Sequence, residues 1–277
     1  MSTLVVKLGG AEAVDATAVI ADVAAHVAAG TPTVLTHGGS TAVDATLERL
    51  GRTPEYVETP AGVTGRFTDA ETMEVFTMVM PGQLNTAITV ELQAVGVDAV
   101  GLSGVDGGLL RGPRKSAVRI VEDGRKRIRR GDHAGRIERV NVPLLRLLLE
   151  AGYTPVVSVP MLADDGVAVN ADADRAAAAI GAAMEATVVL LTDVGGVYAD
   201  PDDPTTLIET VETPAEHAAL TDAAEGFMRR KVMAATEALA GGAARVIIAD
   251  ATGTDPLTAA LAGAGTHISA AAIGADT

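Results

Sequence analysis

The stretch Val5-Val6-Lys7-Leu8-Gly9-Gly10 decides the fold of this chain. An apolar run ends in a lysine and two glycines, and an alanine-rich segment follows, which is typical of a strand, a turn and a helix. Glycines let the backbone approach a ligand, and the first N–H groups of a helix bind anions, so the lysine can meet a phosphate there. A strand-ending turn with a chance lysine is the plainer interpretation of this motif alone. No P-loop sequence occurs in the chain.

A second glycine turn, His37-Gly38-Gly39-Ser40, ends the next predicted strand. Parallel strands end at the same edge of a sheet, and ligands of open α/β sheets bind in the crevice at that edge. Two such turns from consecutive strands indicate a ligand site more strongly than either turn alone.

Apolar β-rich runs alternate with helical stretches, which predicts a mainly parallel sheet covered by helices. Asp69 is a plausible helix N-cap, and Asp164-Asp165-Gly166 is the best candidate for a seam between two lobes. We expect one domain over residues 1–277, with an N-lobe of about 1–164 and a C-lobe of about 165–277. The predicted strands are Thr3–Leu8, Thr33–Thr36, Ala99–Leu102, Thr154–Val159, Thr187–Leu191 and Arg245–Ala249. The predicted helices are Ala13–Ala28, Ala42–Leu50, Ala70–Val95, Pro143–Glu150, Ala173–Met184 and Met228–Ala240.

The composition limits the chemistry. The chain has 21 Lys+Arg against 36 Asp+Glu and no cysteine, which excludes disulfides, thiolate catalysis and cysteine-based metal sites. Its five histidines are scattered without ligand spacing, so no protein metal site is predicted. There is no signal peptide and no long uncharged apolar run, so we expect a cytoplasmic protein without a membrane partner. The acidic, lysine-poor composition suggests a salt-rich cytoplasm, although a GC-rich genome could give a similar composition.

Eleven of the 21 basic residues lie between Arg111 and Arg139, and we call this segment the basic island. With four acids it carries about +7, whereas the rest of the chain carries about −22. Such segregation predicts a docking site for an acidic partner. Asp123-Gly124 between two β-rich runs predicts a hairpin, which is too charged to be buried and stands off the body. The residues predicted to dock the partner are Arg114, Arg119, Arg125, Arg127, Arg129 and Arg130.

Four further motifs complete the pattern. They are Asn170-Ala171-Asp172-Ala173-Asp174-Arg175-Ala176-Ala177, Leu191-Thr192-Asp193-Val194-Gly195-Gly196-Val197-Tyr198, Met228-Arg229-Arg230-Lys231-Val232 and Gly265-Thr266-His267-Ile268. Each alone could be a capped helix start, a turn or an amphipathic helix. In this order, after the Lys7 motif, they resemble the amino acid kinase family and its acetylglutamate kinase branch, from Lys7 to Ile268.

This resemblance implies a three-layer α/β/α sandwich with a mainly parallel open sheet, from which the basic hairpin protrudes. It implies ATP with Mg²⁺, the ion being carried largely by the nucleotide. Lys7 and Lys231 would stabilise the phosphoryl group in transfer, and Asp174 would orient both lysines. The implied acceptor residues are Gly38, Gly39, Asn170 and Arg66, the last from Gly65-Arg66-Phe67-Thr68-Asp69. The implied ATP-binding residues are Gly9, Gly10, Thr192, Asp193, Gly195 and Gly196.

Two departures from ordinary acetylglutamate kinases refine the resemblance. Asp172 stands where that branch usually has a second asparagine, and Ser40 where it has a third glycine. Together with the basic hairpin, they look more like the kinases that act on amino acids attached to the C-terminal glutamate of the acidic carrier protein LysW. The implied reaction is phosphorylation of the side-chain carboxylate of carrier-linked glutamate or 2-aminoadipate, in arginine or lysine biosynthesis. One methylene separates these acceptors, so one pocket can take both.

A carboxylate acceptor is already ionised near neutral pH, so the reaction needs no general base, which suits a site without a catalytic His or Cys. The main alternative is an N-acetyl-L-glutamate kinase for the free small molecule, with an incidental or dimer-related hairpin. A non-catalytic sensor on the same fold is disfavoured by the retained Lys7, Lys231 and Asp174. A nucleic-acid site is disfavoured by the lack of interleaved aromatics and by the acidic remainder. We expect a homodimer without arginine feedback, because the first strand begins by Thr3, whereas arginine-inhibited hexamers carry an extra N-terminal helix.

Overall fold

The structure is a computed structural model that describes residues 2–9, 16–60, 62, 64–122 and 125–274. Within these ranges the main sheet has 11 strands, in the order β13-β15-β14-β12-β1-β2-β10-β6-β9, with β5 and β11 also paired to β10. Its strands are β1 (Leu4–Leu8), β2 (Thr33–His37), β5 (Ala99–Gly104), β6 (Leu110–Gly112), β9 (Arg139–Val140), β10 (Thr154–Ala163), β11 (Ala168–Val169), β12 (Thr187–Thr192), β13 (Thr210–Val211), β14 (Arg245–Asp250) and β15 (Thr266–Ser269). The helices are α1 (Ala16–Ala28), α2 (Ser40–Arg49), α3 (Ala70–Thr77), α4 (Asn85–Ala94), α5 (Val142–Glu150), α6 (Ala173–Ala183), α7 (Pro214–Ala223), α8 (Gly226–Ala240) and α9 (Pro256–Ala262).

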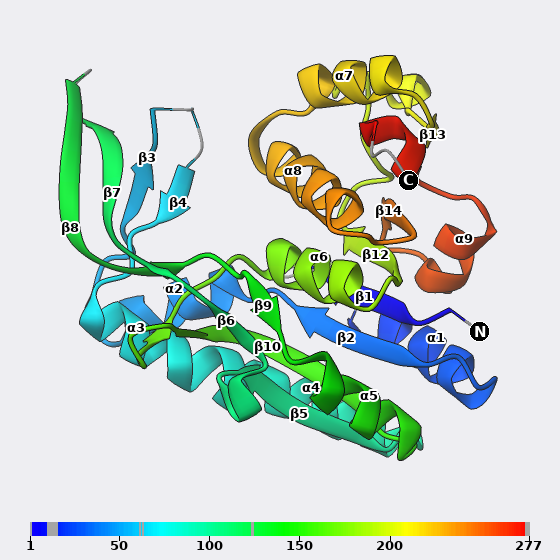
Figure 1. Cartoon of the computed structure of the whole chain (residues 1–277), viewed down its shortest axis with the longest axis horizontal. Coiled ribbons are helices and arrows are strands. Elements are labelled where there is room, and N and C mark those ends of the chain that lie inside the picture. Colours follow the sequence, from blue (N-terminus) through cyan, green and yellow to red (C-terminus); the bar gives the residue numbers. More distant parts are fainter. Residues whose placement is uncertain (1, 10–15, 61, 63, 123–124, 275–277) are drawn as a thin grey trace.

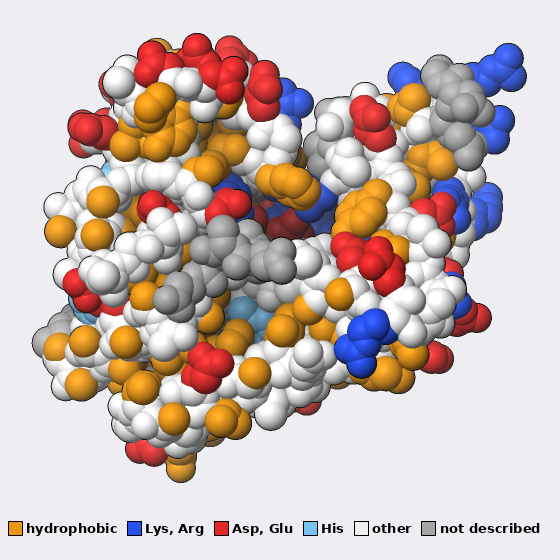
Figure 2. Space-filling view, turned by 180° about the vertical axis from the view of Figure 1, so that it is seen from behind, with side chains coloured by type: hydrophobic (Ala, Val, Ile, Leu, Met, Phe, Trp, Pro, Cys, Tyr) orange, Lys and Arg blue, Asp and Glu red, His pale blue; other side chains and the backbone are white. Residues whose placement is uncertain are grey.

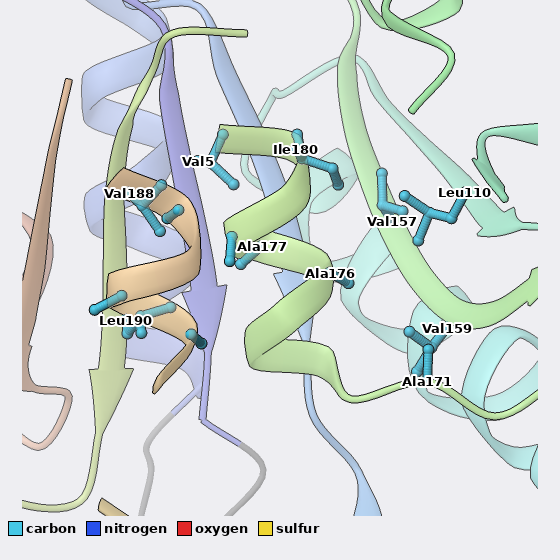
Figure 3. Packing of buried hydrophobic residues seen from close by; sticks show 14 of the residues in the cluster. Val5, Leu110, Val157, Val159, Ala171, Ala176, Ala177, Ile180, Val188 and Leu190 are labelled. Atoms are coloured by element: carbon cyan, nitrogen blue, oxygen red, sulfur yellow. The ribbon is translucent and has the colours of Figure 1, made fainter. Parts of the chain in front are cut away.

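The centre of the sheet is parallel, and its strands are buried on both faces. β14, β12, β1, β2, β10 and β5 pair in parallel, whereas β15, β11 and β9 pair antiparallel to their neighbours β14, β10 and β6. Because side chains alternate along a strand, β1 supplies two cores. Leu4, Val6 and Leu8 join the cluster with α1, α4 and α9. Val5 joins the other cluster, on the face covered by α6 and α8, where Figure 3 shows it beside Ala177. The predicted three-layer α/β/α class is confirmed.

The predicted helix Ala70–Val95 is one continuous helical path with a change of geometry in the middle. α3 ends at Thr77, a π-helical segment η1 (Met78–Leu84) follows, and α4 begins at Asn85. Pro81 lies inside η1, and because proline has no N–H to donate, the regular α-helical hydrogen-bond pattern cannot continue through it. Asp69 is the N-cap of α3, as predicted, with its side chain accepting from Thr72 N.

Two small antiparallel hairpins project from the body on the same side of the molecule (Figure 1). One consists of β7 (Arg114–Glu122) and β8 (Arg125–Gly135), and the other of β3 (Tyr56–Glu58) and β4 (Thr64–Arg66). The predicted basic hairpin is therefore present, although its turn at Asp123-Gly124 lies outside the described residues. Figure 2 shows a hollow between these hairpins and the part of the molecule around α7. Basic side chains gather on the hairpins, and acidic side chains gather around α7.

Several short elements were absent from the sequence expectations. Strands of two or three residues, such as β11 and β13, are too short to show a period of two. α7 did carry a signal, since Thr213 and Glu216 form a capping box around Pro214 at the first turn. Asp164-Asp165-Gly166 lies at the turn between β10 and β11. Among the described residues, no helix is both long and apolar enough to cross a membrane.

Candidate active site

Lys7, Asp174 and Lys231 meet at the centre of the molecule. Lys7 Nζ lies 2.8 Å from Asp174 Oδ1, and Lys231 Nζ donates to Asp174 Oδ2 at 3.2 Å. The Lys7 contact is an ion pair without hydrogen-bond geometry at Oδ1. One carboxylate therefore holds two ammonium groups from β1 and α8 on its two oxygens, and the predicted trio is brought together.

Alternation along β1 explains why Lys7 reaches this place. Lys7 shares the face of Val5, which is the face covered by α6 and α8. Asp174 lies in the first turn of α6, where Asp172 caps the helix by accepting from Arg175 N at 3.1 Å. A carboxylate near a helix N-terminus is favoured by the helix dipole. The site also lies between β12 and β1, where the chain connections diverge, which is the usual ligand position of an open α/β sheet.

The charges of this trio depend on one another. Burial alone would raise the pKa of Asp174, but the charges of Lys7 and Lys231 outweigh it and lower the pKa to about 2. Burial, with the like charge of Lys7, lowers the pKa of Lys231 below its ordinary value. Asp174 therefore stays ionised at neutral pH and acts as a fixed counter-ion rather than as a proton acceptor.

The His37–Ser40 turn follows β2, next to Lys7. His37 is buried, and Nδ1 lies 2.9 Å from Gly38 O while Nε2 lies 3.3 Å from Asn85 Nδ2. Burial, reinforced by the charge of Lys7, lowers the pKa of His37 to about 4, so the ring is neutral near pH 7. Gly39 precedes α2, and a Cβ there would lie 2.3 Å from Leu84 Cδ1 and 2.6 Å from Met80 Sδ, so these side chains would have to move to admit one.

Arg66 is held by a polar network that the sequence did not reveal. Its Nη1 forms a short ion pair with Asp44 Oδ1, and its Nη2 donates to Ser40 Oγ at 2.8 Å and to Tyr56 OH at 2.8 Å. Tyr56 OH in turn donates to Asp44 Oδ2 at 2.7 Å. Arg66 therefore lies against the His37–Ser40 turn, with a carboxylate of the protein as its partner. Asp44 was recognisable in principle, since it follows Ser40 by one helical turn on α2.

Asn170 is tied to two segments distant in sequence. Its Nδ2 donates to Thr68 Oγ1 at 3.0 Å, and its backbone N donates to His133 O at 2.7 Å. His133 N donates to Thr68 O at 2.7 Å, and Asp132 Oδ1 accepts from Thr68 N at 3.1 Å. The base of the basic hairpin thus lies between the Arg66 segment and the Asn170 segment. Thr68, Asp132 and His133 were missed as site residues, although Thr68 belongs to the motif that contains Arg66.

A cavity of about 520 Å³ opens at the carboxyl ends of β12 and β14. It is lined mainly by small residues, including Gly195, Ala249, Gly253 and Gly265. Of the predicted ATP-binding residues, Gly195 lines this cavity, Gly196 follows it, and Thr192 donates to Asp193 Oδ1 at 3.1 Å at the end of β12. Gly9 follows β1, and Gly10 lies outside the described residues.

The basic residues of the hairpin are divided between two faces, because opposite residues of antiparallel strands share a face. Val118 is opposite Arg129 and Ile120 opposite Arg127, and this inner face packs on β3–β4, with Arg129 stacked on Phe67 at 3.9 Å and paired with Glu55. Arg125 belongs to the same face by alternation. The outer face carries Arg119, Lys126 and Arg130 around Ile128, which is 64% exposed.

Some of the predicted docking arginines have structural partners within the chain, as Arg129 and Arg114 show. Arg129 braces the two hairpins through Glu55 and Phe67. Arg114 donates from Nε to Asp132 O at 3.2 Å, and its Nη2 lies 3.0 Å from His133 Nε2, at the base of the hairpin. Arg119, Arg125 and Arg130 are exposed on the strands.

The paired lysines on one carboxylate, at the ligand-binding edge of an α/β/α sandwich, are the arrangement that the resemblance implied. Residues 2–250 match the amino acid kinase family, and the chain therefore belongs to this family and is a kinase. It is 45% identical over 271 residues to LysW-aminoadipate kinase of Deinococcus radiodurans, covering 97% of this chain and 92% of that protein. It is also 41% identical over 222 residues to acetylglutamate kinase of Methanopyrus kandleri, covering 79% of this chain and 86% of that protein.

Solved structures agree with the fold. N-acetylglutamate synthase of Neisseria gonorrhoeae, complexed with coenzyme A and N-acetyl-glutamate, aligns with a TM-score of 0.75 and 28% identity. The alignment covers 97% of this chain but only 59% of that protein. The similarity therefore concerns the whole of this chain and a part of the larger enzyme.

Proposed function

We propose that this kinase transfers the γ-phosphoryl group of ATP to the side-chain carboxylate of glutamate or 2-aminoadipate carried on the acidic protein LysW. A carboxylate oxygen of the acceptor attacks the γ-phosphorus, the bond to the β,γ-bridging oxygen breaks, and ADP leaves. The product is an acyl phosphate. The proposal includes a cytoplasmic homodimer, a role in arginine or lysine biosynthesis, and an acceptor lobe and a nucleotide lobe that meet at the lysine pair.

The lysine pair supports phosphoryl transfer. In the proposed reaction, Lys7 and Lys231 stabilise the negative charge that spreads over the transferring group, and Asp174 fixes both ammonium groups before the substrates arrive. Because Asp174 is ionised and engaged by both lysines, it serves as an orienting group. The acceptor needs no base, since its carboxylate is already ionised.

The nucleotide lies, in this proposal, along the carboxyl ends of β1, β12 and β14. The cavity of about 520 Å³, lined mainly by glycines, alanines and other small residues, suits a ligand that approaches the backbone closely. Gly9, Gly10, Thr192, Asp193, Gly195 and Gly196 are the proposed contacts. Within the described part of the chain, no three His, Asp or Glu side chains gather as metal ligands, so Mg²⁺ would be held chiefly by the phosphates, where it neutralises their charge.

One observation supports a substrate carried on a protein. The strand β8, which bears arginines of the basic island, continues to the residues proposed to bind the phosphoryl acceptor. β8 begins at Arg125 and reaches His133, whose backbone N and O bond to Thr68 and Asn170. A protein docked on the hairpin is therefore adjacent to the acceptor residues Gly38, Gly39, Arg66 and Asn170. The Deinococcus radiodurans relative supports the same substrate class.

The runner-up is a kinase for free N-acetyl-L-glutamate, which the Methanopyrus kandleri relative favours. The two proposals separate in one assay. The purified enzyme is given ATP, Mg²⁺ and either carrier-linked glutamate, carrier-linked 2-aminoadipate or free N-acetylglutamate, and the acyl phosphate is trapped with hydroxylamine. Turnover of the carrier-linked acceptors with little turnover of free N-acetylglutamate is expected. Efficient turnover of the free acceptor alone would replace the proposal by the runner-up.

A further inference from the structure

Arg230 lies between α8 and β4 and is not part of the trio Lys7, Asp174 and Lys231. It precedes Lys231 on α8, its Nη2 donates to the backbone O of Thr64 on β4, and its Nη1 lies 3.6 Å from Asp172 Oδ2. The side chain is 28% exposed, so a ligand can reach it. Gly65 lies beside the guanidinium, and a Cβ built there would make ordinary van der Waals contact with Nη2, at 3.9 Å.

The neighbours of Arg230 place it at the acceptor side. Thr64 is two residues before Arg66, and Asp172 is two residues after Asn170. The guanidinium therefore touches the residues that flank two proposed acceptor contacts, from the opposite wall of the cleft. In Figure 1, α8, which carries Arg230, faces β4 from the part of the molecule that does not carry the hairpins.

The ion pair of Arg230 with Asp172 leaves capacity for another anion. At 3.6 Å it is longer than a hydrogen bond. The other carboxylate oxygen of Asp172 accepts from Arg175 N as the cap of α6. A guanidinium has five N–H donors in a planar fork that fits a carboxylate with two parallel hydrogen bonds.

The proposed acceptor supplies such a carboxylate, and this step rests on the proposed function. An acetyl group that blocks an α-amine is neutral. A C-terminal glutamate has two carboxyl groups, and whichever one forms the amide, the other stays ionised near neutral pH. We infer that Arg230 binds this second carboxylate of the blocking group, exchanging its contact with Thr64 O for it, and so selects acceptors with an anionic acyl group.

The inference is tested with acceptors that differ in one charge. N-glutaryl-2-aminoadipate carries the carbon skeleton of the linking glutamate with its free carboxylate, and N-pentanoyl-2-aminoadipate replaces that carboxylate by a methyl group. The wild-type enzyme is expected to show a lower KM for the glutaryl acceptor than for the pentanoyl one. Arg230→Gln should raise KM for the glutaryl and carrier-linked acceptors about 10- to 100-fold, and should leave the pentanoyl KM within about 2-fold.

Two variants complete the design. Arg229→Gln removes an exposed arginine from the same helix and should change neither KM. Arg230→Lys keeps the charge without the fork, and should raise the glutaryl KM by a smaller factor, which also covers the case in which Arg230→Gln does not fold. The KM for ATP and the melting temperature are measured for each variant.

The outcomes separate the inference from the proposed function. Equal losses on the glutaryl and pentanoyl acceptors would mean that Arg230 only ties α8 to β4, and the inference would fail. Equal KM values for both acceptors in the wild type would overturn it as well. A wild type that phosphorylates N-acetylglutamate but neither the carrier-linked nor the glutaryl acceptor would instead overturn the proposed function, and the inference with it.

Discussion

Asn170 Nδ2 donates a hydrogen bond to Thr68 Oγ1 at 3.0 Å, which joins the start of the α6 segment to the segment that carries Arg66. Thr68 is fully buried, and the backbone of His133 bridges the same two residues. Asn170 itself is half-buried, and its amide loses a hydrogen bond in a largely desolvated place if Thr68 Oγ1 is removed, which carries a cost. The side chain of Asn170 is therefore positioned by Thr68.

Thr68→Val should weaken binding of the substrate that receives the phosphoryl group, although Thr68 itself does not touch this substrate in the proposed complex. Valine preserves the shape of threonine but has no oxygen to accept the hydrogen bond from Asn170 Nδ2. The KM for the substrate that receives the phosphoryl group should therefore rise about 10-fold, while the KM for ATP stays unchanged. Thr33→Val is the matched control, because Thr33 is also buried and hydrogen-bonded but lies at the start of β2, away from the turn at its carboxyl end. Steady-state kinetics in both substrates decide the matter, and a raised ATP KM with a normal acceptor KM would contradict the assignment.

Lys7→Ala and Lys231→Ala should each lower kcat at least ~100-fold, because each removes a preorganised cation from the transferring phosphoryl group. Circular dichroism should show an intact fold. Removing one lysine also leaves Asp174 with a single counter-ion, so some loss of thermal stability is expected as well. Arg229→Ala, an exposed cation next to this site in sequence, should keep kcat. A near-normal kcat in either lysine variant would show that the lysine has another role.

The two faces of the basic hairpin should differ in carrier docking. The inner face packs on β3–β4, which lies between the hairpin and α8 in Figure 1, whereas the outer face is turned away from β3–β4. Arg125→Glu with Arg127→Glu on the inner face should therefore abolish activity on the carrier-linked acceptor. Arg119→Glu with Arg130→Glu makes the same change of charge on the outer face and should cost much less. Arg129 is left intact, because its reversal would also break the contacts with Glu55 and Phe67.

Salt sharpens this comparison. Near 1 M salt the Debye length is roughly 3 Å, so distant attraction is screened and only close pairing survives. The difference between the two double variants, measured as kcat/KM on the carrier-linked acceptor, should therefore persist in high salt, while the KM for ATP remains that of the wild type. Equal losses from both faces at high salt would show that the hairpin does not dock the carrier by its inner face.

The pH dependence of stability should contain a contribution from His37. Its pKa is lowered from 6.5 to about 4 in the folded chain, so the unfolded chain takes up a proton first as the pH falls. The contribution of His37 to the free energy of unfolding is therefore fully present above about pH 6.5. It is lost as the pH falls from about 6.5 to about 4, by on the order of 3 kcal/mol. Asp174 acts lower, because its pKa falls from 3.8 to about 2, and its contribution is lost across that window.

His37→Asn isolates this contribution. The variant has no titrating ring at this position, so the free energy of unfolding, measured by denaturant titration at several pH values from 4 to 7, should fall less steeply than that of the wild type. The replacement also changes packing at all pH values, and the slope rather than the absolute stability is the readout. Parallel curves for the two proteins would mean that folding does not shift the pKa of His37.

The sequence alone determined the elements that repeat with a regular period. The six predicted strands are all present, because each is an apolar run long enough to show its character. The predicted helices are present with ends shifted by a few residues, except that the predicted start of the first helix at Ala13 lies outside the described residues. Asp123-Gly124 between two β-rich runs predicted the hairpin β7–β8. The single helix predicted over Ala70–Val95 did not anticipate the π-helical segment around Pro81, because a helical period cannot show how the chain accommodates a proline there.

Only the tertiary structure decided which side chains meet. Lys7, Asp174 and Lys231 stand in three distant motifs, and their ion pairs exist because β1, α6 and α8 pack on one face of the sheet. The partners of Arg66, Asn170 and Arg129 follow from the packing of the two hairpins against the body. Local periodicity fixes which face of an element a side chain occupies, whereas the element that covers that face is set by long-range packing. For this reason the sequence showed Arg230 only as a charged residue at the start of a predicted helix, whereas the fold brings it into contact with Thr64 and close to Asp172.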